Sequence, residues 1–299
     1  DHRDLHSFPT RRSSDLWDYQ IESLKQWAKL VDGFRCDVAS FVPLEFWKRA
    51  RAAVEAVRPG CIWLAESIHR GFGTVARREG VYAARDTELF QAFDMEYEYD
   101  VRETFDDYLR GKTSLAHWLD GLNFQEAVYP ANYNKLRFLE NHDQPRIASL
   151  VTGDRALENY TAMLYFLKGT TLLYAGQEFG DEHRPSLFER EPIDRDTGRD
   201  LTPLMRRLYE IRRDVLGPDD DFIARDGGGH IAVMERQNAA GAKLGVFSLR
   251  AAPGTVAVNL PDGDFQNLLD GGTVSVRDGK LATDGRPVIV TAKRFLHAI

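Results

Sequence analysis

The chain has 299 residues, of which 43% are hydrophobic and 28% are charged, and its formal net charge is -7 at pH 7. This composition excludes disordered and collagen-like classes and predicts a soluble protein with one large domain and one small one. No Lys/Arg cluster stands apart from acidic residues, which argues against a nucleic-acid partner, and the apolar runs are far too short for a membrane span. Two cysteines, Cys36 and Cys61, exclude a disulfide framework but leave the compartment open, whether cytoplasmic or secreted.

Residues 1–16, DHRDLHSFPTRRSSDL, are polar and have no hydrophobic period. A common DNA sequencing adapter, translated in one frame, yields the same residues in the same order. We therefore interpret residues 1–16 as a non-native, disordered segment rather than a natural basic arm, and exclude them from fold reasoning. On this interpretation the natural chain was cut upstream of Trp17, and its own N-terminus with any signal peptide is lost.

From Trp17 onward, helices and strands are expected to alternate. Apolar residues at three- and four-residue spacing predict helices over residues 17–30, 43–57, 100–110, 114–122, 156–168 and 202–215. Apolar runs predict strands over residues 31–36, 61–65, 89–95, 135–140 and 170–175. Polar groups of catalytic type occur only where strands end, which favours part of a (β/α) barrel over a doubly wound sheet. No glycine-rich phosphate loop follows any strand, which weakens the dinucleotide-binding alternative.

Beyond residue 221 the pattern changes to short alternating strands separated by Gly-, Asp- and Pro-rich turns. These strands are expected over residues 230–236, 243–249, 255–260, 273–276 and 287–292. The predicted organisation is therefore a barrel segment over residues 17–221, followed by a small all-β sandwich domain over residues 222–299.

The first strand ends on Arg35 and Asp37, which share one face because side chains two positions apart in a strand point to the same side. A guanidinium beside a carboxylate keeps the carboxylate ionised. Such an aspartate suits a nucleophile or a charge stabiliser, and an ordinary strand-end ion pair is an equal alternative at this point. Glu66 follows one strand-helix-strand crossover later, so both acids are expected at the same edge of neighbouring parallel strands.

Another polar cluster, His142 and Asp143, follows the predicted strand over residues 135–140. Three carboxylates at strand ends suit sugar chemistry, because retaining glycosidases use an ionised nucleophile and a protonated acid roughly 5 Å apart. Glu66 has no adjacent cation in the sequence, so its pKa is expected to be raised. Asp143 and His142 would then hold ring hydroxyls and favour the cation-like transition state.

The segments GFRCD (33–37), AE (65–66) and NHD (141–143) resemble three conserved regions of the α-amylase family, glycoside hydrolase family 13, in the same order and with similar spacing. The resemblance implies a partial (β/α)8 TIM barrel containing strands 4 to 8. It also implies Asp37 as nucleophile, Glu66 as general acid/base and Asp143 as transition-state stabiliser. Arg35 and His142 are implied as substrate-site residues.

The resemblance also has departures. The family's first conserved region would lie upstream of Trp17. Where many α-amylases carry Lys-His after the nucleophile, with the histidine position helping to bind calcium, this chain has Ser40 and Phe41. We therefore expect no metal and no cofactor here, with calcium binding by the complete enzyme as the open alternative. The segment NHDQPR (141–146) is similar to α-glucosidases and oligo-1,6-glucosidases, which implies that Arg146 reaches a terminal sugar, with an ion pair as the alternative.

The resulting hypothesis is a truncated retaining glycosidase that cleaves α-glucosidic bonds of α-glucans or oligosaccharides by double displacement. The alternatives are a transglycosylase of the same family and a non-catalytic carbohydrate-binding relative, although a missing nucleophile or acid would mark the latter and both are present. The 299-residue chain itself is expected to be inactive, because its strands do not close an eight-stranded barrel. The oligomeric state stays open.

Overall fold

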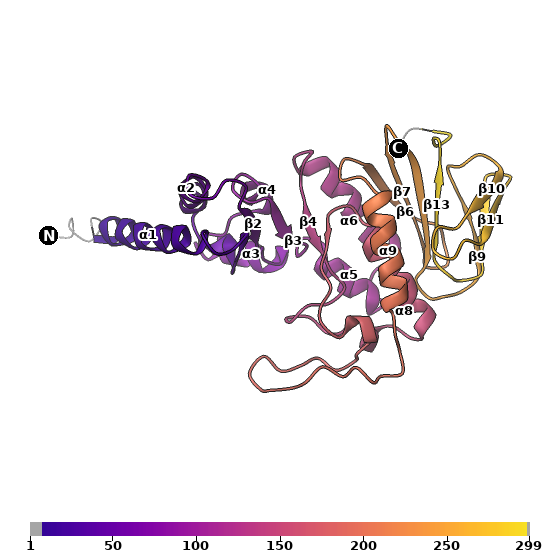
Figure 1. The fold of residues 1–299 in the computed structure, drawn as a ribbon, viewed down its shortest axis with the longest axis horizontal. Helices are drawn as coiled ribbons and strands as arrows, with labels where there is room; N and C mark the ends of the chain where they lie inside the picture. The colour runs from indigo at the N-terminus through magenta and orange to yellow at the C-terminus, as the bar shows by residue number, and fades with distance from the viewer. Residues whose placement is uncertain (1–7, 298–299) are drawn as a thin grey trace. The chain divides into compact units, whose positions relative to one another are not determined.

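The computed structural model describes the backbone of residues 8–297 and the side chains of residues 15–297. The chain forms two compact units that divide after Asp100 (Figure 1). This division differs from the predicted domain boundary at residues 221/222, which stays a prediction. Of the helices that the structure describes, none is both long and apolar enough to cross a membrane.

The first unit contains three parallel strands and the helices that connect them. Its elements are α1 (Phe8–Trp27), β1 (Gly33–Cys36), η1 (Ala39–Phe41), α2 (Leu44–Glu55), β2 (Ile62–Ala65), α3 (Arg70–Arg78), α4 (Asp86–Leu89) and β3 (Met95–Tyr97). β1 pairs with β2, with Cys36 opposite Ala65, and β2 pairs with β3, with Leu64 opposite Met95. The carboxyl ends of these strands therefore meet at one edge, as the crossover spacing predicted.

Helix α1 begins inside the segment expected to be disordered. It starts at Phe8, whereas residues 1–7 lie outside the described residues. The expectation of disorder is therefore wrong from Phe8 onward. Adding residues to an existing helix is much easier than nucleating one, and Pro9 is tolerated because it lies in the first turn.

The strand predicted over residues 89–95 is also wrong. Leu89 ends the short helix α4, and the strand β3 begins only at Met95. Leu89 and Phe93 are buried in the core of the first unit, beside Trp47 and Trp63. The apolar run is therefore a buried helical turn, a case that periodicity alone does not distinguish from a buried strand.

Aromatic rings form the centre of this core. Trp47 of α2 contacts Trp63 of β2 and Phe93, with ring centroids 6.5 Å and 5.2 Å away. Full burial of a large apolar side chain contributes about 1.5–3 kcal/mol, so this group attaches α2 firmly to the sheet. The attachment fixes the β1 and β2 ends that carry the candidate site.

The second unit begins with helices and two short parallel strands. Its elements up to Asp214 are α5 (Arg102–Leu109), α6 (Leu115–Val128), β4 (Lys135–Arg137), α7 (Ile147–Leu150), α8 (Asp154–Phe166), β5 (Thr170–Thr171), η2 (Gln177–Phe179) and α9 (Thr202–Asp214). β4 pairs with β5 in parallel, with Leu136 opposite Thr170. Both strands end earlier than predicted. Phe138 and Leu139 follow β4 and are buried. The apolar run therefore continues beyond the end of the strand.

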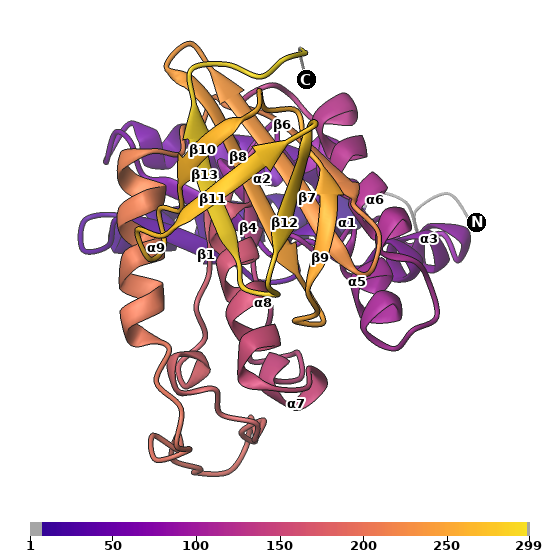
Figure 2. The same ribbon diagram turned by 90° about the vertical axis from the view of Figure 1, so that its right-hand side faces the viewer.

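The rest of the second unit is a sandwich of two antiparallel sheets (Figure 2). One sheet contains β13 (Val288–Ala292), β8 (Gly241–Ser248), β7 (Ile231–Asn238) and β6 (Asp221–Asp226), in this order. The other contains β10 (Gly263–Gln266), β11 (Thr273–Arg277), β12 (Lys280–Thr283) and β9 (Gly254–Ala257). Buried side chains such as Val246 and Leu281 belong to a single apolar cluster. The predicted all-β sandwich is confirmed, although β6, β10 and β12 were not predicted.

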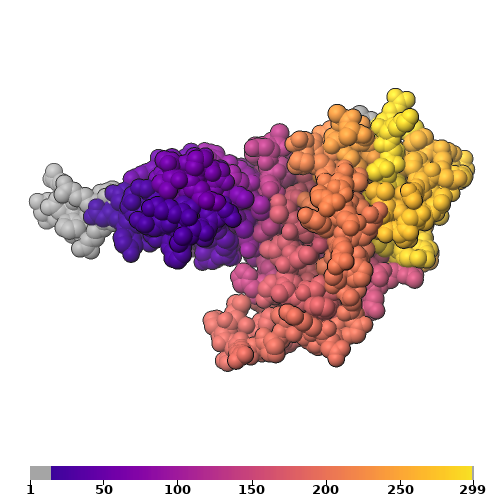
Figure 3. Space-filling view, viewed as in Figure 1, coloured from indigo at the N-terminus to yellow at the C-terminus, as the bar shows by residue number. Residues whose placement is uncertain are grey.

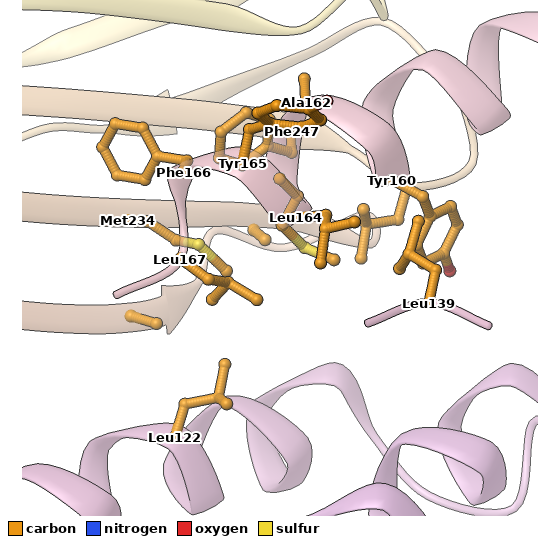
Figure 4. Packing of buried hydrophobic residues seen from close by; sticks show 14 of the residues in the cluster. Leu122, Leu139, Tyr160, Ala162, Leu164, Tyr165, Phe166, Leu167, Met234 and Phe247 are labelled. Carbon is orange, nitrogen blue, oxygen red and sulfur yellow. The ribbon is translucent and has the colours of Figure 1, made fainter. Parts of the chain in front are cut away.

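Helix α8 packs between the parallel strands and the sandwich. Its Phe166 ring contacts Phe247 of β8 at a centroid distance of 5.6 Å (Figure 4). Its Asn159 accepts a hydrogen bond from the Ser248 amide and donates one to the Gly285 carbonyl. Parallel strands joined by helices, followed by a β-sandwich, confirm the predicted fold class.

Candidate active site

The first part of the candidate site lies where β1 and β2 end. Asp37 follows β1 directly and Glu66 follows β2 directly. The Glu66 amide donates to the Cys36 carbonyl at 3.0 Å, and the Ala39 amide donates to the Glu66 carbonyl at 2.9 Å. The backbone ladder therefore continues past the strand ends and holds both acids at one edge.

Arg35 connects the two acids. Its guanidinium forms an ion pair with Asp37 and a second one with Glu66, in which Nη2 and Oε1 are 2.7 Å apart. The guanidinium also lies over the Tyr97 ring, 5.6 Å from its centroid. The sequence assigned this cation to Asp37 alone, and the structure corrects that assignment because the two acids share it.

Glu66 nevertheless has a raised pKa, because its surroundings oppose the ionised form. The Glu66 side chain is only 11% exposed, whereas the Asp37 side chain is 76% exposed. Burial raises the pKa of Glu66, and the nearby Asp37 carboxylate raises it further, against the opposing effects of the Val38 amide and Arg35. The raised pKa of Glu66 agrees with the expectation from the sequence. The expected cause is wrong, because Arg35 is a neighbouring cation.

Val38 holds Glu66 through a backbone of unusual geometry. Its φ and ψ are 41° and 44°, the left-handed region that β-branched residues rarely adopt. In this conformation the Val38 amide donates to Glu66 Oε2 at 2.8 Å. Strain of this kind costs about 1–3 kcal/mol and persists only where its surroundings enforce it.

We expect Asp37→Asn to lower the pKa of Glu66, because the substitution removes a negative charge that raises it. NMR titration of the 299-residue chain with 13C-labelled glutamate carboxyl groups measures this value. Asp32→Asn is the matched control, because the Asp32 side chain is 90% exposed and pairs with Arg58 instead. An unchanged Glu66 titration in Asp37→Asn would contradict the coupling of the two acids.

The second unit contains the other predicted site residues. His142 and Asp143 lie in the loop after β4, where Asn141 Oδ1 accepts a hydrogen bond from the Asp143 amide at 2.9 Å. His142 Nε2 is 3.1 Å from Asp143 Oδ2, and the two side chains are 40% and 38% exposed. Both are therefore accessible to a ligand. Arg35, Asp37 and Glu66 come together in the first unit, and His142 and Asp143 in the second.

Arg146 has a different environment from the one expected of a sugar contact. Its side chain is 0% exposed, and its Nη1 lies 2.7 Å from Glu140 Oε1. Its Nε donates to the His183 carbonyl at 3.0 Å, and its Nη2 is 3.6 Å from Asp181 Oδ2. The structure thus supports the ion-pair alternative. The buried guanidinium attaches the loop after β4 to the loop after β5.

The surroundings of Arg146 are closely packed. Glu140 Oε2 also accepts a hydrogen bond from the Ile147 amide at 2.7 Å, so both of its oxygens are engaged. A Cβ atom at Gly176, where φ is 98°, would come within 2.9 Å of Arg146 Nη2, so this position requires glycine. Sequence reasoning missed Glu140 and Asp181. One feature of the sequence could have indicated a buried role for Glu140, namely its position directly after the apolar Phe138-Leu139 pair.

The positions linked to calcium by the family pattern provide no ligand set. Ser40 is buried and its carbonyl accepts from the Ala84 amide, while the Phe41 ring packs against Phe72 at 5.5 Å. Within the part of the chain that the structure describes, no three His, Cys, Asp or Glu side chains come together as a metal site. These residues do not fit a calcium site.

Comparison with known proteins agrees with this geometry. The model of the α-amylase catalytic domain matches residues 12–216, and that of the bacterial α-amylase C-terminal domain matches residues 223–290. The catalytic-domain match covers most of the chain, and the fold has parallel strands followed by a β-sandwich. Together they define the class of protein. The chain belongs to the α-amylase family.

Individual relatives are similar over most of this chain. An α-amylase from Lactobacillus plantarum, known from a crystal structure, shares 41% sequence identity with this chain and matches its fold with a TM-score of 0.88. The match covers 93% of this chain and 66% of that one. The α-amylase MalA of Haloarcula japonica is 28% identical over 84% of this chain and 36% of its own length. The oligo-1,6-glucosidase of Bacillus cereus is 25% identical over 70% of this chain and 46% of its own length. The chain thus spans less than half the length of these two curated relatives.

Proposed function

We propose that this chain is the part of a retaining glycosidase that carries the nucleophile and the acid/base for cleaving α-glucosidic bonds. The observation that carries the proposal is the pair of strand-end acids on one guanidinium. Asp37 is exposed, whereas Glu66 is buried with a raised pKa. Two neighbouring carboxyl groups with different environments are what acid and nucleophile roles require.

In the proposed reaction, Asp37 attacks the anomeric carbon while Glu66 donates its proton to the leaving glycosidic oxygen. The C–O bond breaks, and a covalent glycosyl ester forms on Asp37. Glu66, now ionised, then removes a proton from water, whose oxygen attacks the anomeric carbon and releases Asp37. The half-exposed His142 and Asp143 are assigned to holding hydroxyls and stabilising the positive charge that develops on the sugar ring.

The proposed substrates are α-glucans or their oligosaccharides. Support comes from the names of the relatives, which include α-amylases and an oligo-1,6-glucosidase. If a sugar hydroxyl replaces water in the second step, the same residues perform transglycosylation. Product analysis by chromatography distinguishes hydrolysis from transfer, and NMR of the first product formed shows whether the α-configuration is retained.

We expect the 299-residue chain alone to show no detectable hydrolysis of nitrophenyl α-glucoside or malto-oligosaccharides. The described parallel strands are too few to enclose a barrel-end substrate site. A chimera that supplies the upstream part of the Lactobacillus plantarum α-amylase before residue 17 is expected to be active. Turnover by the chain alone would contradict the first expectation, and an inactive but folded chimera would contradict the proposed function.

A further inference from the structure

A cavity in the second unit has none of the candidate catalytic residues in its lining. It has a volume of about 550 Å³ and is lined by residues of α9, of the start of β5 and of β7. Figure 3 shows α9, coloured orange, at the surface of this unit. Four cationic side chains line the cavity, namely Lys168, Arg212, Arg213 and Arg236, against the single carboxylate of Asp219 among the lining residues. His142 and Asp143 follow β4, whereas this cavity lies where β5 begins.

Three of the four cations already have a carboxylate partner within hydrogen-bonding distance. The pairs are Lys168 with Glu126 at 2.8 Å, Arg213 with Asp214 at 2.7 Å, and Arg236 with Asp220 at 3.0 Å. Arg212 differs, because no carboxylate of the described chain forms an ion pair with it. A partly buried guanidinium without a counter-charge is unusual, since buried charges in proteins are normally paired.

The hydrogen bonds of Arg212 leave two of its N–H groups unused, one on Nε and one on Nη2. Its Nη1 donates to the carbonyls of Tyr165 and Leu167 at 2.7 Å and 3.0 Å, and its Nη2 donates to the carbonyl of Gly169. The Nε–H has no acceptor among the residues described. An edge formed by Nε and Nη2 matches the two oxygens of a carboxylate or phosphate group.

The electrostatics at Arg212 favour the binding of an anion. Burial, together with the nearby guanidinium groups of Arg236 and Arg137, lowers the pKa of Arg212 to about 10. Asn134 also lines the cavity. Its Oδ1 accepts from the Thr170 hydroxyl at 3.1 Å, so its NH2 group remains available as a donor.

We propose that this cavity binds an oxyanion, the phosphate or carboxylate group of a small ligand, on the Nε and Nη2 edge of Arg212. The proposal is independent of the glycosidase function, because none of the lining residues belongs to the candidate active site. It predicts a binding site where β4 and β5 begin, at the end of these strands opposite to the one followed by His142 and Asp143.

The test uses the 299-residue chain and two probes, sodium phosphate and sodium acetate, against sodium chloride at equal ionic strength. Phosphate is expected to raise the thermal unfolding midpoint in a concentration-dependent manner, because ligands of the folded state stabilise it. Arg212→Gln is expected to weaken phosphate binding about tenfold or more. Arg206→Gln, on the same helix but outside the cavity, is expected to bind as the unchanged chain does.

The Nε–H resonance of Arg212 in the unchanged chain provides a second measurement that does not depend on a variant folding. It is expected to shift during the phosphate titration. A shift with phosphate alone identifies a phosphate site, whereas a shift with both probes identifies a general oxyanion site. If neither probe moves the midpoint or the resonance beyond the effect of chloride, or if Arg212→Gln binds as tightly as before, the proposal fails.

Discussion

Asp37→Asn is expected to lower the kcat of the active chimera by roughly four orders of magnitude or more, because an amide does not form the glycosyl ester. The side chain is 76% exposed and asparagine has the same shape, so the unfolding midpoint is expected to stay unchanged. The rate is measured with nitrophenyl α-glucoside under saturating conditions.

Asp32→Asn serves as the control for this loss of activity. Asp32 lies just before β1, its side chain is 90% exposed, and the substitution makes the same change of charge. Its kcat is expected to stay within about twofold of the unchanged chimera. Full activity in Asp37→Asn would exclude Asp37 as the nucleophile while leaving the fold assignment intact.

The second large effect concerns stability. Arg146→Met is expected to lower the free energy of unfolding by about 3–5 kcal/mol, because it leaves the buried Glu140 carboxylate without its cation. Burial already raises the pKa of Glu140, so ionised Glu140 is destabilising without this partner. Urea unfolding of the 299-residue chain, followed by circular dichroism, measures the change.

Arg286→Met provides the matched comparison in the same unit. Arg286 pairs with Asp284 at 2.9 Å, but both side chains are 59% exposed, so the loss is expected to be about 0–1 kcal/mol. Adding Glu140→Leu to Arg146→Met is expected to recover part of the lost stability, because no unpaired charge then remains. Equal losses for Arg146→Met and Arg286→Met would contradict a stabilising role for the buried pair.

The relation between Asp37 and Glu66 illustrates what could be predicted from sequence. Their separation equals one crossover, and parallel pairing of the two strands follows, with Cys36 opposite Ala65. The second contact of Arg35, to Glu66, could not be predicted, because it crosses from one strand to the next. Spacing along a strand identifies neighbours on that strand only.

Other causes account for the burial of Arg146 and for two of the three unpredicted strands, β6 and β10. Arg146 is covered by a loop that contains Asp181 and His183, and no local pattern reports a contact over that distance in sequence. β6 and β10 are edge strands of their sheets, with exposed or half-exposed positions along most of their length. Burial alternates along β6, but the exposed Ile223 is apolar like the buried Phe222 and Ala224, so the sequence does not show the alternation. β10 is short and has a single large apolar side chain, Phe265.

The left-handed backbone at Val38 lowers the stability of the folded chain, but it also positions the amide that donates to Glu66. A glycine there would adopt φ 41° without steric conflict, and it would relieve strain in the folded chain. Glycine would also free the peptide that donates to Glu66 to sample other orientations. Glycine would therefore relieve the backbone strain, whereas valine restricts the amide to the orientation in which it donates to Glu66.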